Sequence, residues 1–217
     1  MVGPWPRAWS NWAHAPRTVQ FADVVRARRM TRAFTAASVD SHLIDECVDL
    51  ASRAPSAGKS QGWHLLVLEG SDVERYWNVA FPVDRREGFA FPGLFTAPVM
   101  ALSLCDSSAY VSRYSEDDKE ATGLGAGIDA WPAAYWTIDA SFATMTFLLA
   151  LEDASLGALF FAHANEPGLR TEFSIPDHME FLGAIAIGHR SDEENQRGRS
   201  ANRTRRSSAS IIHRSNW

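Results

Sequence analysis

The chain has 217 residues, of which 46% are hydrophobic and 22% are charged, and its formal net charge is −5. This composition is typical of a globular protein, and the length allows one domain or two small ones. The negative charge argues against general binding to nucleic acids or to anionic membranes. The longest apolar run, 142–151, is too short to span a bilayer, and the N-terminus lacks a signal-peptide core. We therefore expect a cytoplasmic protein without a membrane partner.

The N-terminal residues 1–20 are expected to form an irregular arm, and residues 21–217 a single domain, since no repeat or long linker divides them. Prolines prevent a regular helix in the arm, yet its three tryptophans favour packing on the body or on a partner subunit. These tryptophans are Trp5, Trp9 and Trp12.

The segment Arg28-Arg29-Met30-Thr31-Arg32 places three guanidinium groups within five residues. A guanidinium group is a planar, charged fork that meets a phosphate with paired N–H bonds. The arginines follow an apolar pattern at Phe21, Val24 and Val25 that has the spacing of one helix face. Two interpretations stay open, a phosphate site or a solvated helix end, where arginine is also favourable.

A short helix is predicted next, between an N-cap at Asp40 and a stop at Pro55. Val39 and Ile44 flank the N-cap as a hydrophobic staple. The predicted buried face consists of Leu43, Cys47, Leu50, Ala51 and Ala54. Cys47 and a second isolated cysteine, Cys105, are expected to be core residues, and they fit a reducing compartment.

The loop after this helix contains very small residues. Ser56, Ala57 and Gly58 leave the backbone open, so that a ring or a ribityl chain can approach it closely. Lys59 follows them and is one of only two lysines in the chain. The apolar run 63–68 is then predicted to form a strand.

Between residues 71 and 105 the pattern predicts a helix near 72–80 and a buried central strand at 98–105. Aromatic residues broken by prolines lie between them. They are Phe81, Phe89, Phe91 and Phe95.

The polar region 106–135 begins with Tyr110, Arg113 and Tyr114 at helical spacing. Its glycines do not form a dinucleotide fingerprint, because no strand precedes them. We interpret the region as a mobile flap with aromatic residues, since such loops often cover active sites.

The stretch 138–156 is apolar on all sides, which predicts a helix buried in the core or between subunits. Asp139 is placed as its N-cap and Gly157 as its C-terminal stop. A short strand at 158–161 and a loop at 162–165 follow.

A further strand is predicted at 182–188, and an arginine-rich tail comes after it. Such a tail is usually a basic extension. Ile211 and Ile212 argue against that interpretation, because they offer a strand to a sheet.

The basic segment, the helix, the loop Ala54-Pro55-Ser56-Ala57-Gly58-Lys59-Ser60-Gln61-Gly62-Trp63 and the next strand together resemble the FMN-dependent nitroreductase family. The resemblance extends over roughly residues 21–213. The chain departs from the family pattern at Met30, where the family has Ser, and at Lys59 and Gly62, where it has Asn and Pro. We expect Lys59 to alter the orientation and potential of the flavin more than its binding.

The resemblance implies an α+β fold, with a mainly antiparallel central sheet flanked by helices, and a homodimer that exchanges a C-terminal strand. It implies FMN at the interface and hydride transfer from NAD(P)H to a small organic acceptor, such as a nitro or quinone compound. No catalytic side chain and no metal are expected. The implied cofactor-binding residues are Arg28, Arg29, Arg32, Pro55, Ser56, Ala57, Gly58, Lys59, Phe161, Ala162, His163, Arg203 and Arg205. Arg206 is the alternative if the register of the tail differs.

Three other functions stay open on the sequence. One is a flavin destructase or reductive dehalogenase on the same scaffold, and another is a flavin-binding stress protein with little turnover. The third is a flavin-free module that binds through its basic tail.

Overall fold

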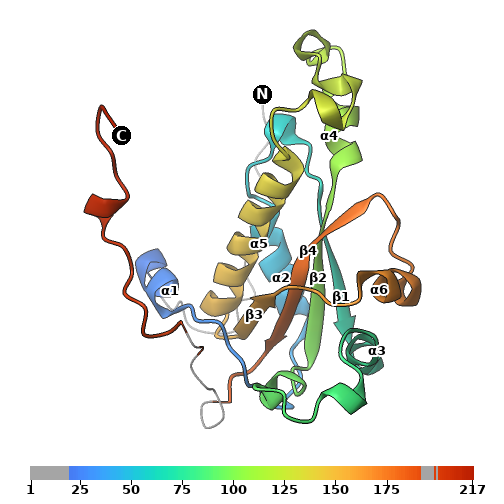
Figure 1. Ribbon diagram of the computed structural model, residues 1–217, viewed down its shortest axis with the longest axis vertical. Coiled ribbons are helices and arrows are strands. Elements are labelled where there is room, and N and C mark those ends of the chain that lie inside the picture. Colours follow the sequence, from blue (N-terminus) through green and yellow to red (C-terminus); the bar gives the residue numbers. More distant parts are fainter. Residues whose placement is uncertain (1–19, 192–197, 199) are drawn as a thin grey trace, which may run out of the picture.

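The computed structural model describes residues 20–191, 198 and 200–217 (Figure 1). Its centre is a four-stranded sheet with the strand order β1-β2-β4-β3, and every pairing is antiparallel. The strands are β1 (Trp63–Glu69), β2 (Val99–Asp106), β3 (Gly157–Phe161) and β4 (Met179–Gly188). The four strands that the sequence predicts are therefore confirmed, and so is the α+β class.

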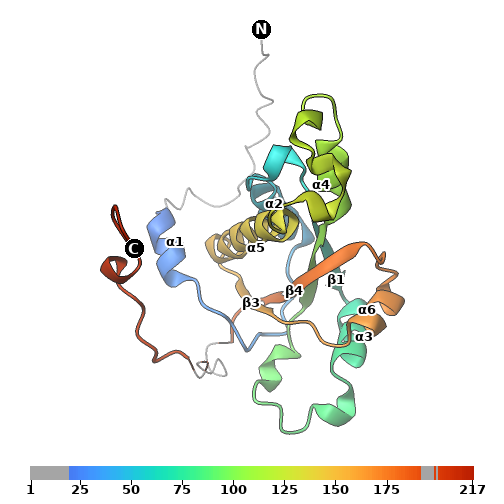
Figure 2. The ribbon, with the colours of Figure 1, turned by 45° about the horizontal axis from the view of Figure 1, so that its top comes forward.

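The α-helices of the described residues cover both faces of this sheet (Figure 2). They are α1 (Phe21–Ala27), α2 (Ser41–Ala51), α3 (Ser71–Ala80), α4 (Ser107–Tyr114), α5 (Tyr135–Asp153) and α6 (Glu166–Phe173). Helices α2 and α5 lie on one face, and α3 and α6 lie on the other. None of these described helices has the length and apolar character needed to cross a membrane.

Strand β2 is buried on both faces, which is why it reads as a continuous apolar run. Met100 and Leu102 pack in one cluster with Trp77 of α3. Their neighbour Ala101 points to the opposite face and packs in a second cluster with Phe147 of α5. The alternation along one strand thus separates two apolar layers.

Helix α2 has the predicted N-cap, because the Asp40 side chain accepts from the His42 backbone N–H at 3.0 Å. Its buried residues are Ile44, Cys47 and Ala51. The predicted face was wrong at Leu50, whose exposed fraction is 37%. Ile44, assigned only to the staple, turns inward instead and packs beneath α5.

Helix α5 begins earlier than predicted, and Asp139 is not its N-cap. The helix starts at Tyr135, so Asp139 lies in its second turn. The carboxylate of Asp139 accepts the Ala57 N–H and the Tyr110 hydroxyl instead. These two hydrogen bonds to distant residues determine the position of the Asp139 side chain, and the local spacing of residues does not reveal them.

The end of α5 also differs from the prediction, because Gly157 is not the helix stop. The helix ends at Asp153, and Ser155 takes the left-handed conformation with φ of 63°. Gly157 begins β3, where a Cβ atom would come within 2.8 Å of the Thr31 hydroxyl. Close packing of the Thr31 and Arg190 side chains against the backbone therefore explains this glycine.

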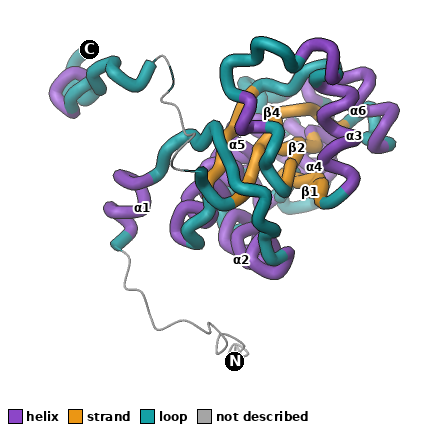
Figure 3. The backbone as a smooth tube through the Cα atoms, turned by 90° about the horizontal axis from the view of Figure 1, so that it is seen from below, coloured by secondary structure: helices purple, strands orange, loops and turns teal. Residues whose placement is uncertain are grey.

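Helix α1 and the C-terminal segment lie outside the main body of the molecule (Figure 3). Val24 of α1 is buried, whereas Phe21 and Val25 are exposed, so the predicted apolar face is covered only in part by the residues that the structure describes. The predicted strand at Ile211 and Ile212 is not formed in the single chain, where both residues are exposed. The N-terminal arm, with Trp5, Trp9 and Trp12, lies outside the described residues except for its last position.

Candidate functional site

The basic segment runs along the free edge of strand β3. The Thr31 backbone N–H donates to the Ala158 carbonyl oxygen at 2.9 Å, and Met30 forms a parallel bridge with Ala158. The Thr31 side chain is completely buried. The sheet edge therefore fixes the backbone between the arginines, although it does not fix their side chains.

The three arginines of this segment have different surroundings. Arg29 donates to the carbonyl oxygens of Arg26, Ala27 and Arg28, so it caps the C-terminus of α1. Arg32 donates to the Met30 carbonyl oxygen at 3.1 Å, and its guanidinium carbon lies 5.2 Å from the centre of the Phe91 ring. Arg28 forms no ion pair with any described residue and is half-buried, which leaves a cation for a ligand.

The small-residue loop forms a tight turn of 3₁₀ helix at Ala57–Lys59. Gly58, Lys59 and Gln61 all have positive φ, at 59°, 61° and 55°. This conformation is unfavourable for a residue with a long side chain, and asparagine tolerates it better than lysine. The Lys59 side chain is exposed.

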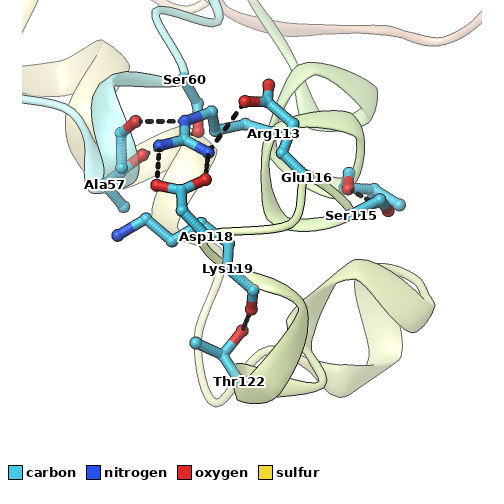
Figure 4. Close-up of polar contacts among 10 residues, drawn as sticks. Ala57, Ser60, Arg113, Ser115, Glu116, Asp118, Lys119 and Thr122 are labelled. Carbon is cyan, nitrogen blue, oxygen red and sulfur yellow. Dashed lines mark hydrogen bonds and ion pairs between the residues drawn. The ribbon is translucent and has the colours of Figure 1, made fainter.

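Two polar contacts hold this turn against α4 and α5, and Figure 4 shows the one from α4. Arg113 of α4 donates through Nε to the Gly58 carbonyl oxygen at 2.9 Å. The carboxylate of Asp139 accepts the Ala57 N–H at 2.7 Å and the Tyr110 hydroxyl at 2.9 Å. The sequence analysis assigned no site role to any of these side chains, because each acts across more than 25 residues of chain.

A small cavity of about 110 Å³ lies beside the turn. Pro55 and Ser56 line it on one side, and Tyr110 and Asp139 on the other. A larger cavity of about 620 Å³ lies between the 36–41 segment, α3 and the 95–99 segment. No cofactor-binding residue predicted from the sequence lines the larger cavity, so size alone does not identify the site.

The last residue of β3, Phe161, and the loop after it, with Ala162 and His163, contain the predicted flavin contacts of this region. His163 is not a free loop histidine, since its Nε2 lies 3.0 Å from the Glu166 carboxylate and its Nδ1 is buried without a partner among the described residues. Arg170 donates to the same carboxylate at 2.7 Å and, with His163, holds the pKa of Glu166 below its usual value. In the sequence, the spacing of three residues from His163 to Glu166 and of four from Glu166 to Arg170 indicates that these side chains can interact.

The tail arginines Arg203 and Arg205 are exposed and form no ion pair with a described residue. Arg206 instead donates to the Ser210 carbonyl oxygen within the tail. Figure 1 shows the tail on the same side as α1, whereas the Ala57–Lys59 turn lies with α4 at the opposite end of α5. One chain therefore does not bring the tail arginines and the turn together.

The sequence model of the Nitroreductase family matches residues 25–189, and the chain belongs to this family. That assignment agrees with the antiparallel sheet and with the placement of the basic segment on its edge.

Several relatives are named as reductases. The chain is similar to a "4-nitrobenzoate reductase" of Nocardioides sp., with 26% identity over 80% of this chain and 82% of that protein. It is also similar to a "Putative NADH dehydrogenase/NAD(P)H nitroreductase" of Methanothermobacter thermautotrophicus, with 25% identity over 77% and 75% of the two chains. Family membership and these names support an oxidoreductase.

The fold has close counterparts among solved structures. The nitroreductase family protein of Streptococcus pneumoniae superposes with a TM-score of 0.68, at 20% identity, over 90% of this chain and all of that one. At this identity the likeness establishes the nitroreductase fold.

Proposed function

We propose that the protein is an FMN-dependent oxidoreductase that uses NAD(P)H to reduce a small organic acceptor, such as a nitro or quinone compound. Support comes from the family and from relatives named as NAD(P)H nitroreductase and 4-nitrobenzoate reductase. The observation that carries the cofactor is the positive charge of Arg28, Arg203 and Arg205, with which no described residue forms an ion pair. Such guanidinium groups suit the single terminal phosphate of FMN.

Each group of site residues has a distinct role in this proposal. Arg28, Arg203 and Arg205 bind the phosphate, while Arg29 holds the end of α1 from which Arg28 projects. Arg32 and Lys59 supply positive charge near the ring system. The backbones of Pro55–Gly58 and Phe161–His163 shape the flavin pocket. FMN bound by these residues would supply the redox chemistry, which is hydride transfer between the nicotinamide and the acceptor.

The active unit in this proposal is a homodimer with an exchanged C-terminal segment. The tail arginines and the Ala57–Lys59 turn lie apart on one chain, whereas a two-fold axis brings one copy's tail to the partner's turn. Large apolar side chains on α1, on α5 and in the tail are uncovered, which is typical of an association surface. They are Phe21, Val25, Tyr135, Ile138, Phe142, Met145, Ile211 and Ile212.

The test is the visible spectrum of the purified protein, followed by chromatography of the released cofactor. We expect a flavin spectrum and FMN rather than FAD. Arg28→Ala should weaken FMN binding by roughly 1.5–3 kcal/mol, the range for a hydrogen bond to a charged group. Arg26→Ala is the matched control, because Arg26 ends the same helix but pairs with Asp23 at 3.2 Å.

A colourless protein that takes up no flavin contradicts the proposed function. Equal FMN affinity in the parent and in Arg28→Ala removes Arg28 from the site and leaves the family assignment untouched.

A further inference from the structure

The backbone of the turn between Ala57 and Gln61 has an unfavourable conformation, so other contacts of the protein must stabilise it. Three of its residues have positive φ, and two of the three, Lys59 and Gln61, are not glycine. Residues persist in this sparsely populated region only where their surroundings determine the conformation, and such residues cluster at functional sites. The contacts that impose this conformation are therefore part of the site.

Asp139 holds the first peptide of the turn. Its Oδ2 accepts both the Ala57 N–H at 2.7 Å and the Tyr110 hydroxyl at 2.9 Å. Asp139 is only 8% exposed and Tyr110 only 1%. Burial and the neighbouring carboxylate raise the pKa of Tyr110, so the phenol remains a hydrogen-bond donor at neutral pH. No described residue donates to Oδ1, the other carboxylate oxygen.

Arg113 holds the peptide between Gly58 and Lys59. It donates to a carbonyl oxygen there, whereas Asp139 accepts from an N–H. Its Nε donates to the Gly58 carbonyl oxygen at 2.9 Å, while its two terminal nitrogens donate to Asp118 at 2.7 and 2.8 Å (Figure 4). A bidentate carboxylate fixes the plane of the guanidinium group and thereby the direction of Nε–H. The hydrogen bond from Arg113 holds the pKa of Asp118 below its usual value, so the pair stays charged at neutral pH.

Packing closes the arrangement. The ring of Tyr114 lies over Gly58, where a Cβ atom would come within 2.7 Å of a ring carbon. Asp139 and Arg113 bind neighbouring groups of the turn, but the Gly58 N–H has no acceptor among the described residues. A backbone donor at a small-residue turn is a suitable contact for a polar edge of a planar cofactor.

We propose that Asp139 and Arg113 are positioning residues that set the peptides of Ala57 and Gly58 for flavin binding. The inference deepens the proposed function and rests on it. Tyr110 and Arg113 both belong to α4, so this helix takes part in both sets of contacts that hold the turn.

The test compares variants of the two anchors with a matched arginine. Arg113→Ala should weaken FMN affinity by up to about tenfold, because FMN binding must then order a turn that has lost one hydrogen bond to a charged group, and it should change the flavin absorption spectrum. Arg75 is the control, because it also bridges carboxylates, Asp72 and Glu172 at 2.7 Å, and donates to a carbonyl oxygen, but on α3. Arg75→Ala should leave FMN affinity and the spectrum unchanged.

Two substitutions of Asp139 separate geometry from charge. In Asp139→Asn the new amide oxygen can accept both bonds that Oδ2 accepts, so this variant should keep FMN affinity within about threefold, whereas Asp139→Ala should lose about tenfold. Equal losses in both variants overturn the positioning role, since they assign the effect to charge. Unchanged affinity and spectrum in Arg113→Ala and Asp139→Ala also overturn it. A parent protein without flavin defeats the proposed function instead, so the two failures are distinguishable.

Discussion

Helix α5 has two apolar faces, and only one of them is covered by other described residues. Phe147 and Leu151 are completely buried against α2 and the sheet. Ile138, Phe142 and Met145 are equally apolar but 40%, 48% and 41% exposed. The apolar composition of a helix indicates that both of its faces need to be covered. The fold of the single chain determines which of the two faces is covered.

The uncovered face does not stand alone. Helix α1 contacts α5, and its own apolar residues Phe21 and Val25 are 73% and 46% exposed. Single exposed apolar residues are normal on a protein surface, but exposed apolar residues on two neighbouring helices are typical of an interaction surface. In the proposed homodimer, a second copy covers it, which gives the two faces of α5 separable energetic roles.

The largest effect is expected on the buried face. Phe147→Ala should lower the free energy of unfolding by about 3–5 kcal/mol, because the fold cannot fill the cavity that the ring leaves. Urea denaturation followed by tryptophan fluorescence measures this loss. A decrease below about 1 kcal/mol would mean that the buried face is loosely packed, and the contrast between the faces would fail.

A smaller effect, on association rather than on folding, is expected for the exposed face. Phe142→Ala should weaken the dimer by at least tenfold, since a buried phenylalanine contributes about 1.5–3 kcal/mol and each copy supplies one. Sedimentation at several protein concentrations measures the change. Val83→Ala is the control, because Val83 is 68% exposed but lies beyond α3 on the other side of the sheet.

If Phe142→Ala sediments like the parent, the exposed face is not the interface. If Val83→Ala weakens the dimer as much, the effect is not specific to α5.

The sequence predicted the parts of the molecule that apolar periodicity controls. All four strands and the helices near α2, α3 and α5 follow from the spacing of residues that must be buried. On α2 the buried face contains Ile44, Cys47 and Ala51, whereas Leu50 lies outside it and is exposed. Element boundaries failed at Asp139 and Gly157, where contacts from distant segments decide the conformation.

The site was predictable only in part, for the same reason. The Arg28–Arg32 segment and the Ala57–Lys59 turn stand out because unusual residue types lie close together in the chain. Asp139 and Arg113 have no such local signal, since their partners at Ala57 and Gly58 lie 82 and 55 residues away. Their functions emerge only when the chain is folded.

The last prediction concerns the two cysteines, which report on different parts of α5. Cys47 packs with Phe147 and Leu151 beneath the buried face, and Cys105 packs with Trp136 near the start of the helix. Burial raises the pKa of both thiols to about 12. At pH 8 only about one thiol in 10⁴ is then ionised in the folded protein, so labelling has to proceed through unfolded molecules.

Labelling rates of the two cysteines therefore measure how far each α5 substitution opens the fold. In Phe147→Ala both rates should rise with the unfolding constant, whereas in Phe142→Ala both should stay at the parental value when the protein is dilute and monomeric. Mass spectrometry of each cysteine-containing peptide separates the two rates. A rise at Cys47 in Phe142→Ala would show that the exposed face also supports the packing beneath α5, and the two faces would then not be independent.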